Sequence, residues 1–491
     1  MTVPPELIKG YGPYNTPMKH LSAPALSLSV HSFPPPGRKK LFAVLLIGTA
    51  LFSLFPFPGQ AGDHFPTYTC ISTNVRFWED VYSRYTTSQG ILHDQDNLAI
   101  VYTVVDLVTW ETAGSARINQ KLIMLARQHY KQILADLAKG KKPLSDDEKR
   151  VAAMFPRNSH QAFKKARDNI RLQIGQKDRF QEGVIRSGAY MPGIKKIFSS
   201  YNLPPELSYL PHVESSFNPD AHSKAGAAGL WQFTRSTGRQ YMRVDDVVDQ
   251  RYDPYYATRA AAIFLKENFE ALGSWPLAIT AYNHGRNGML RAVAKYDSYE
   301  QIFNNHETGL FKFASRNFYS EFIAAINVAR RLENNKIIVP DRPEATIMVK
   351  MEGFAKAEDI RSHFHLSEED FTRLNPALLN PVLTGKKLIP KNFHVRLPAN
   401  AGTRDLASTI PSSIYYPHQI LDEEYIVRRG DTAGSIARRY KVSVSELITA
   451  NNLNRQATIR IGQKLKIPGT TSIKKNLQVV ILEPSSKIKP N

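Results

Sequence analysis

Residues 203–233 have the sequence LPPELSYLPHVESSFNPDAHSKAGAAGLWQF, and the rest of the chain is organised around them. The pattern predicts a short apolar helix over 204–213 that leads directly into Glu214, because proline is tolerated in the first turn of a helix. A loop containing Ser and Gly and an apolar run at 229–232 follow. A lone Glu at the buried end of an apolar helix is costly to ionise, so we expect Glu214 to hold its proton near neutral pH. Such a carboxyl suits a general acid for glycosidic cleavage.

Ordered motifs in this part of the chain resemble those of the lytic murein transglycosylases. The motifs are Glu214-Ser215, then Ser223, then Gly229-Leu230-Trp231-Gln232, then Ala281-Tyr282-Asn283. The Trp before the Gln, together with appended C-terminal modules, is similar to the membrane-bound D type of this family. Each motif alone is weak, and their specificity lies in the ordered set, which spans roughly a quarter of the chain.

The resemblance implies a lysozyme-like α-helical catalytic domain in which one carboxylate is sufficient. Glu214 would protonate the oxygen between N-acetylmuramic acid and N-acetylglucosamine, and the substrate's own N-acetyl group would help to stabilise positive charge at the anomeric carbon. Deprotonated Glu214 would then take the proton from the muramyl 6-hydroxyl, which closes a 1,6-anhydro ring. The other nearby carboxylate, Asp220, is expected in an exposed turn, and no metal or cofactor is expected.

The same resemblance implies sugar-binding positions around the acid. Ser223 would place a hydroxyl beside the acid and the substrate N-acetyl group; the alternative is a loop serine bonded to its own backbone. Gln232 and Asn283 offer amide donors and acceptors suited to sugar hydroxyls and acetamides. Tyr282 would bond Glu214 or the sugar.

A fourth motif, Arg316-Asn317-Phe318-Tyr319, resembles the family's segment with an aromatic hydroxyl near the acid. Phe318 occupies the usual tyrosine position, and we therefore assign the hydroxyl to Tyr319. Trp231 suits either the core or a platform for a sugar ring.

Composition agrees with an exported, wall-directed protein. The 491 residues can hold two to four domains, and 64 basic against 44 acidic side chains give a net charge of +20. The charge suits an anionic polymer, and no nucleic-acid-binding motif accompanies it. A single cysteine, Cys70, excludes an intramolecular disulfide.

The N-terminus has the layout of a secretory signal peptide, which we place at residues 1–61. Arg-Lys-Lys at 38–40 precedes an uncharged run at 41–57, and Gly59-Gln60-Ala61 supplies small residues for cleavage. The run is just long enough to span a bilayer, so an uncleaved inner-membrane anchor is the alternative. Either version directs the rest of the chain to the periplasm or cell envelope. The residues before Cys70 lack a lipoprotein cleavage pattern.

We expect a mainly α-helical protein with small α+β modules at its C-terminal end. The predicted parts are a helical N-terminal domain at 62–185, the catalytic domain at 186–339, a degenerate LysM-like module at 340–400, a linker at 401–423, a LysM domain at 424–468 and a basic tail at 469–491.

Residues 425–468 form one compact unit that resembles a LysM domain, with a strand, two helices and a closing strand (βααβ). The resemblance implies binding to N-acetylglucosamine polymers, hence to peptidoglycan glycan strands, through Gly430, Asp431, Thr432 and Asn451. At an offset of 76 residues a second, degenerate copy repeats this pattern, with its conserved spacing at Ala357, Ile360, Ser367 and Asn375. This copy has Phe354-Ala355-Lys356 where the LysM unit has Gly-Asp-Thr, so weak or absent sugar binding is expected.

Two alternative functions compete with a lytic transglycosylase. A lysozyme-type hydrolase on the same fold would use water in place of the 6-hydroxyl. A wall-binding scaffold without catalysis would not need Glu214 together with Ser223, Gln232 and Asn283.

Overall fold

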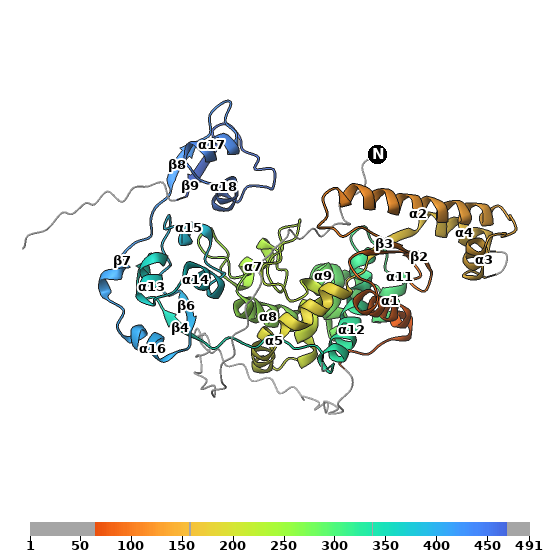
Figure 1. The fold of residues 1–491 in the computed structure, drawn as a ribbon, viewed down its shortest axis with the longest axis horizontal. Coiled ribbons are helices and arrows are strands. Elements are labelled where there is room, and N and C mark those ends of the chain that lie inside the picture. The colour runs from red at the N-terminus through yellow and green to blue at the C-terminus, as the bar shows by residue number, and fades with distance from the viewer. Residues whose placement is uncertain (1–63, 157–158, 336, 469–491) are drawn as a thin grey trace, which may run out of the picture. The chain divides into compact units, whose positions relative to one another are not determined.

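The structure, a computed structural model, describes residues 64–156, 159–335 and 337–468 (Figure 1). The signal peptide or anchor predicted at 1–61 and the basic tail at 469–491 lie outside the described residues. Within the described ranges, no helix combines the length and the apolar character that a membrane crossing requires. The protein is mostly helical, as predicted.

The N-terminal part contains a three-stranded antiparallel sheet in the order β2–β1–β3, on which three helices pack. Its elements are β1 (Gln89–Asp94), β2 (Val101–Asp106), α2 (Ser115–Ala138), α3 (Asp146–Ala153), α4 (His160–Asp168) and β3 (Ile170–Ile174). We predicted a helical N-terminal domain at 62–185, and the structure adds three strands that this prediction did not include. The run 101–105 is rich in β-branched residues, which favour an extended backbone.

A group of helices forms the largest core and carries the predicted catalytic motifs. Its elements are η2 (Thr69–Ile71), α1 (Ser72–Ser83), α5 (Lys177–Ser200), η3 (Pro205–Tyr209), α6 (Leu210–Glu214), α7 (Arg235–Tyr241), α8 (Pro254–Leu272), α9 (Trp275–His284), α10 (Arg286–Val293), α11 (Tyr299–Asn305) and α12 (Phe313–Glu333). Asp253 caps α8 by accepting from the amides of Tyr255 and Tyr256, and Gly273 ends α8 in a left-handed conformation.

Helix α5 begins at Lys177 and continues through Pro192 without ending. Its glycines allow close approach of other segments. A Cβ at Gly183 would lie 2.9 Å from the Ser216 carbonyl, and one at Gly188 would lie 2.3 Å from the Asp341 carbonyl. The helix therefore contacts both the segment after Glu214 and the chain that enters the next module.

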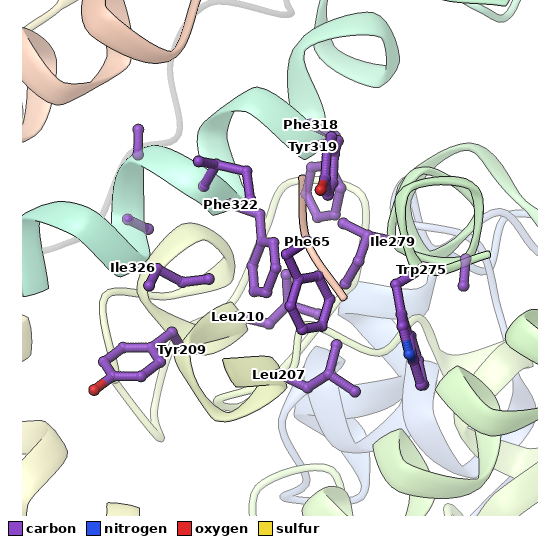
Figure 2. Packing of buried hydrophobic residues seen from close by; sticks show 14 of the residues in the cluster. Phe65, Leu207, Tyr209, Leu210, Trp275, Ile279, Phe318, Tyr319, Phe322 and Ile326 are labelled. Carbon is purple, nitrogen blue, oxygen red and sulfur yellow. The ribbon is translucent and has the colours of Figure 1, made fainter. Parts of the chain in front are cut away.

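The core lies directly beneath η3 and α6. Phe65 packs against Phe322 of α12 at a ring-centroid distance of 5.3 Å, and Leu207 and Leu210 are fully buried beside them (Figure 2). Full burial of each such side chain contributes about 1.5–3 kcal/mol. The short helix that ends in Glu214 is thus anchored by its apolar face, although five residues would not form a stable helix alone.

Two βααβ modules follow. The upstream module contains β4 (Thr346–Lys350), β5 (Phe354–Ala355), α13 (Ala357–His363), α14 (Glu368–Leu374), α15 (Asn380–Leu383) and β6 (His394–Pro398). The downstream module contains β8 (Glu423–Ile426), α17 (Ala433–Arg439), α18 (Val444–Asn451) and β9 (Lys464–Ile467). In each module the first and last strands pair in antiparallel fashion.

The two modules share internal contacts at the predicted offset. Asn375 donates to the Phe371 and Arg396 carbonyls and accepts from the Arg396 amide. Asn451 makes the equivalent three bonds with Leu447 and Lys466. The asparagine side chain in each copy ties the second helix to the closing strand. This structural role explains why both copies have asparagine here, although their surface residues differ.

Residues 401–423 are not the loose linker that we predicted. They contain α16 (Ala401–Ser408), η4 (Ser412–Ile414) and β7 (Tyr415–Tyr416), and β7 pairs with β5. Leu406, Ile410 and Ile414 pack against the upstream core. These apolar residues give the segment a surface to bury, so it folds back on the upstream module.

We expect Asn375→Ala to destabilise the upstream module by about 2–3 kcal/mol, because it leaves buried backbone groups of the closing strand without partners. Amide hydrogen exchange in β4 and β6 measures the change. Glu369→Ala, at an exposed position on the same helix, is the matched control and should leave exchange unaltered. Equal exchange in both variants would contradict the structural role of Asn375.

Candidate active site

Glu214 is the last residue of α6 and is half-buried. The chain turns sharply after it, because Ser216 and Phe217 both adopt left-handed conformations, with φ of 52° and 53°. Two contacts hold this turn: Arg186 donates to the Ser216 carbonyl at 2.9 Å, and the Phe217 ring is fully buried. The catalytic candidate therefore projects from a fixed corner of the backbone.

In residues 221–233, which we call the substrate loop, three consecutive carbonyls accept hydrogen bonds from side chains of the motifs. The Gly229 carbonyl accepts from Gln232 Nε2 at 2.9 Å, and the Leu230 carbonyl accepts from Ser215 Oγ at 2.9 Å. The Trp231 carbonyl accepts from the Tyr282 hydroxyl at 2.8 Å. The motifs that are separated in sequence are thereby brought together in one network.

Two tyrosines lie close enough to Glu214 to be influenced by its charge. Burial, and then the Glu214 carboxylate, raise the pKa of Tyr282 well above its usual value. Burial also raises the pKa of Tyr82 on α1, with further contributions from Glu321 and then Glu214. Both phenols stay protonated at any physiological pH. Tyr82 was not foreseen, because its segment carries no motif and only the tertiary fold brings it to the acid.

The polar candidates occupy the loop and the end of α9. Ser223 Oγ accepts from the Ala227 amide at 3.0 Å, as the backbone alternative predicted, and an accepting hydroxyl retains its proton for donation. Gln232 has a φ of 48° and also donates to the Ala221 carbonyl. Asn283 is exposed, and its Oδ1 accepts from Ser315.

Two aromatic candidates lie in the core. Tyr319 is fully buried among the side chains of Figure 2, and its hydroxyl donates to the Pro66 carbonyl at 3.0 Å. A sugar cannot contact it in this conformation, so we leave Tyr319 out of the proposed site. Trp231 is also fully buried, and its indole N–H donates to Thr258, which settles its role in favour of the core.

A buried ion pair supports the substrate loop from below. Arg251 and Asp249 have side chains only 4% and 3% exposed, and they form a bidentate pair. Arg251 Nη1 donates to the carbonyls of Gly226 and Phe233 at 2.8 and 3.0 Å, which lie at two separate points of the loop. Neither residue belongs to a motif, so the sequence gives no signal for this pair.

His212 is buried two residues before Glu214 in a box of Phe180, Tyr209 and Phe217. Within the described part of the chain, neither of its ring nitrogens has a hydrogen-bond partner. Burial, followed by the charge of Arg186, lowers the pKa of His212 to about 3. The ring is therefore neutral and serves as an aromatic packing element.

A cavity of about 370 Å³ lies at the C-terminal end of α9, directly after Asn283 in sequence. Its lining contains two cations, Arg291 and Lys295, together with Glu307 and the rings of His284 and His306. Burial and neighbouring cations lower the pKa of both histidines. The cavity suits an anionic group.

The predicted sugar-binding residues of the downstream module take part in its internal bonding. Gly430 has a φ of 85°, Asp431 accepts from the Arg428 amide and the Tyr425 hydroxyl, and Thr432 caps α17. Asn451 ties α18 to β9. Gly430, Asp431 and Thr432 thus shape the turn before α17.

Comparison with known proteins identifies both predicted domains. Residues 194–304 match the transglycosylase SLT domain, and residues 425–468 match the LysM domain. Glu214, Ser223, Gln232, Tyr282 and Asn283 fall inside the first match, whereas Tyr319 falls outside it.

Relatives support the same assignment. Membrane-bound lytic murein transglycosylase D of Escherichia coli (strain K12) is 26% identical over 330 residues, covering 62% of this chain and 72% of the relative. Membrane-bound lytic murein transglycosylase C of Actinobacillus pleuropneumoniae serotype 5b (strain L20) is 34% identical over 134 residues, covering 24% and 36%. The cell division protein DipM of Caulobacter vibrioides is 45% identical over 47 residues, covering 10% and 8%. The chain therefore contains a lysozyme-like SLT transglycosylase domain and a LysM domain, and it is a homologue of lytic murein transglycosylases.

Two glycines of the substrate loop provide a matched pair of substitutions. A Cβ at Gly229 would lie 1.8 Å from the Arg251 carbonyl at a φ of +77°, whereas Gly226, at +83°, has no atom within 4 Å. We expect Gly229→Ala to cost more than about 3 kcal/mol and to abolish activity, because both strain and a backbone clash oppose it. Gly226→Ala should cost only about 1 kcal/mol. Urea unfolding followed by tryptophan fluorescence measures both, and similar losses would contradict the clash.

The low pKa of His212 predicts acid destabilisation. The unfolded chain binds a proton near pH 6.5 and the folded chain only near pH 3, so stability is complete above pH 6.5 and falls as the pH falls towards 3. The contribution is about 2 kcal/mol between pH 7 and pH 5. We expect His212→Phe to reduce this slope, measured by urea unfolding at several pH values. His418→Phe, at an exposed position, is the control, and an unchanged slope in His212→Phe would refute the assignment.

Proposed function

We propose that this protein is a peptidoglycan lytic transglycosylase of the cell envelope. It cleaves the β-1,4 bond between N-acetylmuramic acid and N-acetylglucosamine and leaves a 1,6-anhydromuramyl end. Glu214 donates its proton to the bridging oxygen and then accepts the proton of the muramyl 6-hydroxyl. No water is consumed, so the anhydro end is lighter by one water than a hydrolysis product.

The position of Glu214 is the main support. Glu214 is half-buried and close enough to Tyr82 and Tyr282 for its charge to raise the pKa of both phenols, and the neighbouring Ser215 bonds the loop that carries Ser223 and Gln232. A group that acts first as acid and then as base works best when its pKa is close to the ambient pH. Tyr282 donates to the Trp231 carbonyl and feels the charge of Glu214, so it connects the substrate loop to the surroundings of the acid.

We assign sugar contacts to Ser223, Gln232 and Asn283. Their hydroxyl and amide groups can bond acetamide and hydroxyl groups, and they come from two rigid positions, the substrate loop and the end of α9. The cavity that contains Arg291 and Lys295 offers a place for carboxylates of the wall polymer. The LysM domain adds a second attachment to glycan strands, and the N-terminal segment at 1–61 would export or anchor the protein.

The hydrolase and scaffold alternatives are separated by Glu214→Gln, which keeps the shape of the side chain but removes the proton. We expect digestion of purified sacculi to fall about a thousandfold while binding is retained. Asp220→Asn, a matched change at the carboxylate next along the chain, should retain most activity. Mass spectrometry of the products from the unaltered protein should show anhydro ends.

Each alternative makes a different prediction in the same assay. Products that carry reducing muramic acid ends would establish a hydrolase. Equal release from the unaltered protein and from Glu214→Gln would establish that Glu214 has no catalytic part. Loss of activity in Asp220→Asn as well would require a second carboxylate in the mechanism.

A further inference from the structure

The upstream module has the LysM-like arrangement, but its own chain covers the positions where the downstream copy has Gly-Asp-Thr. Phe354 and Ala355 form β5, which pairs with Tyr416 and Tyr415 of β7. A Cβ at Gly353 would lie 2.8 Å from the Tyr415 side chain, so the cover is close. Strand β7 therefore covers these positions. A role other than glycan binding has to be found for this module.

Another part of this module is joined to the catalytic domain by backbone hydrogen bonds. The Asp249 amide donates to the Ala377 carbonyl at 2.8 Å, and the Leu379 amide donates to the Val247 carbonyl at 3.0 Å. Val247 and Val248 belong to the buried core of the module, although they precede it by about a hundred residues. Segment 247–249 thus belongs to the catalytic domain in sequence but packs and hydrogen-bonds with the upstream module.

Arg396 makes a second connection at the start of α8. Its guanidinium donates to Asp253 Oδ2 at 3.1 Å and lies 4.7 Å from the centre of the Tyr255 ring. The side chains of Arg396 and Asp253 are 14% and 7% exposed, so solvent screens this pair weakly. The other oxygen of Asp253 caps α8.

Both connections lead to the substrate loop. Asp249, held through its amide by the upstream module, pairs with Arg251, and Arg251 donates to two carbonyls of the loop. The Arg251 carbonyl in turn packs against Gly229. Segment 247–253 therefore lies between the module on one side and the loop with Ser223 and Gln232 on the other.

We propose that the upstream module serves as a brace for the substrate loop, and that Arg396 is a positioning residue of the active site. The module fixes segment 247–253, and this segment fixes the loop through Arg251. The proposal rests on the proposed function only in so far as the loop binds the glycan; the mechanical connection is independent of it.

The two copies provide a matched experiment in the full-length protein. Arg396 and Lys466 occupy equivalent positions, since the backbone of each is bonded by Asn375 or Asn451. We expect Arg396→Ala to accelerate amide exchange at Ala228 and Gly229 on the order of tenfold, and to raise KM for solubilised glycan strands more than it lowers kcat. Arg396→Lys should restore part of both. Lys466→Ala, at an exposed site, should alter neither.

The readouts separate the brace from general destabilisation and from failure of the proposed function. Exchange in α12 must stay unchanged, because that helix lies outside the proposed connection. Unchanged exchange at Ala228 and Gly229 in Arg396→Ala would overturn the brace, whatever the activity. Faster exchange with unchanged KM would retain the mechanical connection but remove its role in substrate binding. Inactivity of the unaltered protein on glycan strands would count against the proposed function alone.

Discussion

The substrate loop contains no helix or regular strand, and its buried backbone groups must nevertheless be hydrogen-bonded. This constraint governs the site, because an unpaired buried carbonyl costs about 1–3 kcal/mol. The donors come from outside the loop: Ser215 follows the catalytic candidate, Tyr282 lies in the last turn of α9, and Arg251 reaches the loop from a buried ion pair. The loop conformation is therefore a property of the whole catalytic domain.

Strained backbone in the site follows from the same constraint. Ser216, Phe217 and Gln232 hold left-handed conformations that cost on the order of 1 kcal/mol or more each. Burial of Phe217 and the bonds made by Gln232 Nε2 offset this cost locally. In return, the backbone at Glu214 is held in one conformation. Substrate binding therefore does not have to supply the free energy of ordering this carboxyl.

Local chemistry explains what the sequence could and could not predict. The cap at Asp253, the capping box of Ser443 with Glu446, and the strand at Lys464–Ile467 depend on neighbouring residues, so local sequence patterns are sufficient to predict them. The nearness of Tyr82 to Glu214 and the pairing of β1 with β3 depend on long-range packing. Arg251 was missed for the same reason, since nothing near it in sequence distinguishes a loop-supporting guanidinium from a solvated one.

The two βααβ copies show which part of a repeated module is free to change. Asn375 and Asn451 retain the same three backbone bonds, because the closing strand has no other way to satisfy those groups. Surface positions carry no such requirement. Arg396 instead of Lys466 adds a planar, forked donor that can meet both a carboxylate and an aromatic ring in a partly dry contact, which a lysine ammonium does less well. A different residue at one surface position can therefore attach one copy to the catalytic domain, while the interior of both copies still specifies the same arrangement of helix and closing strand.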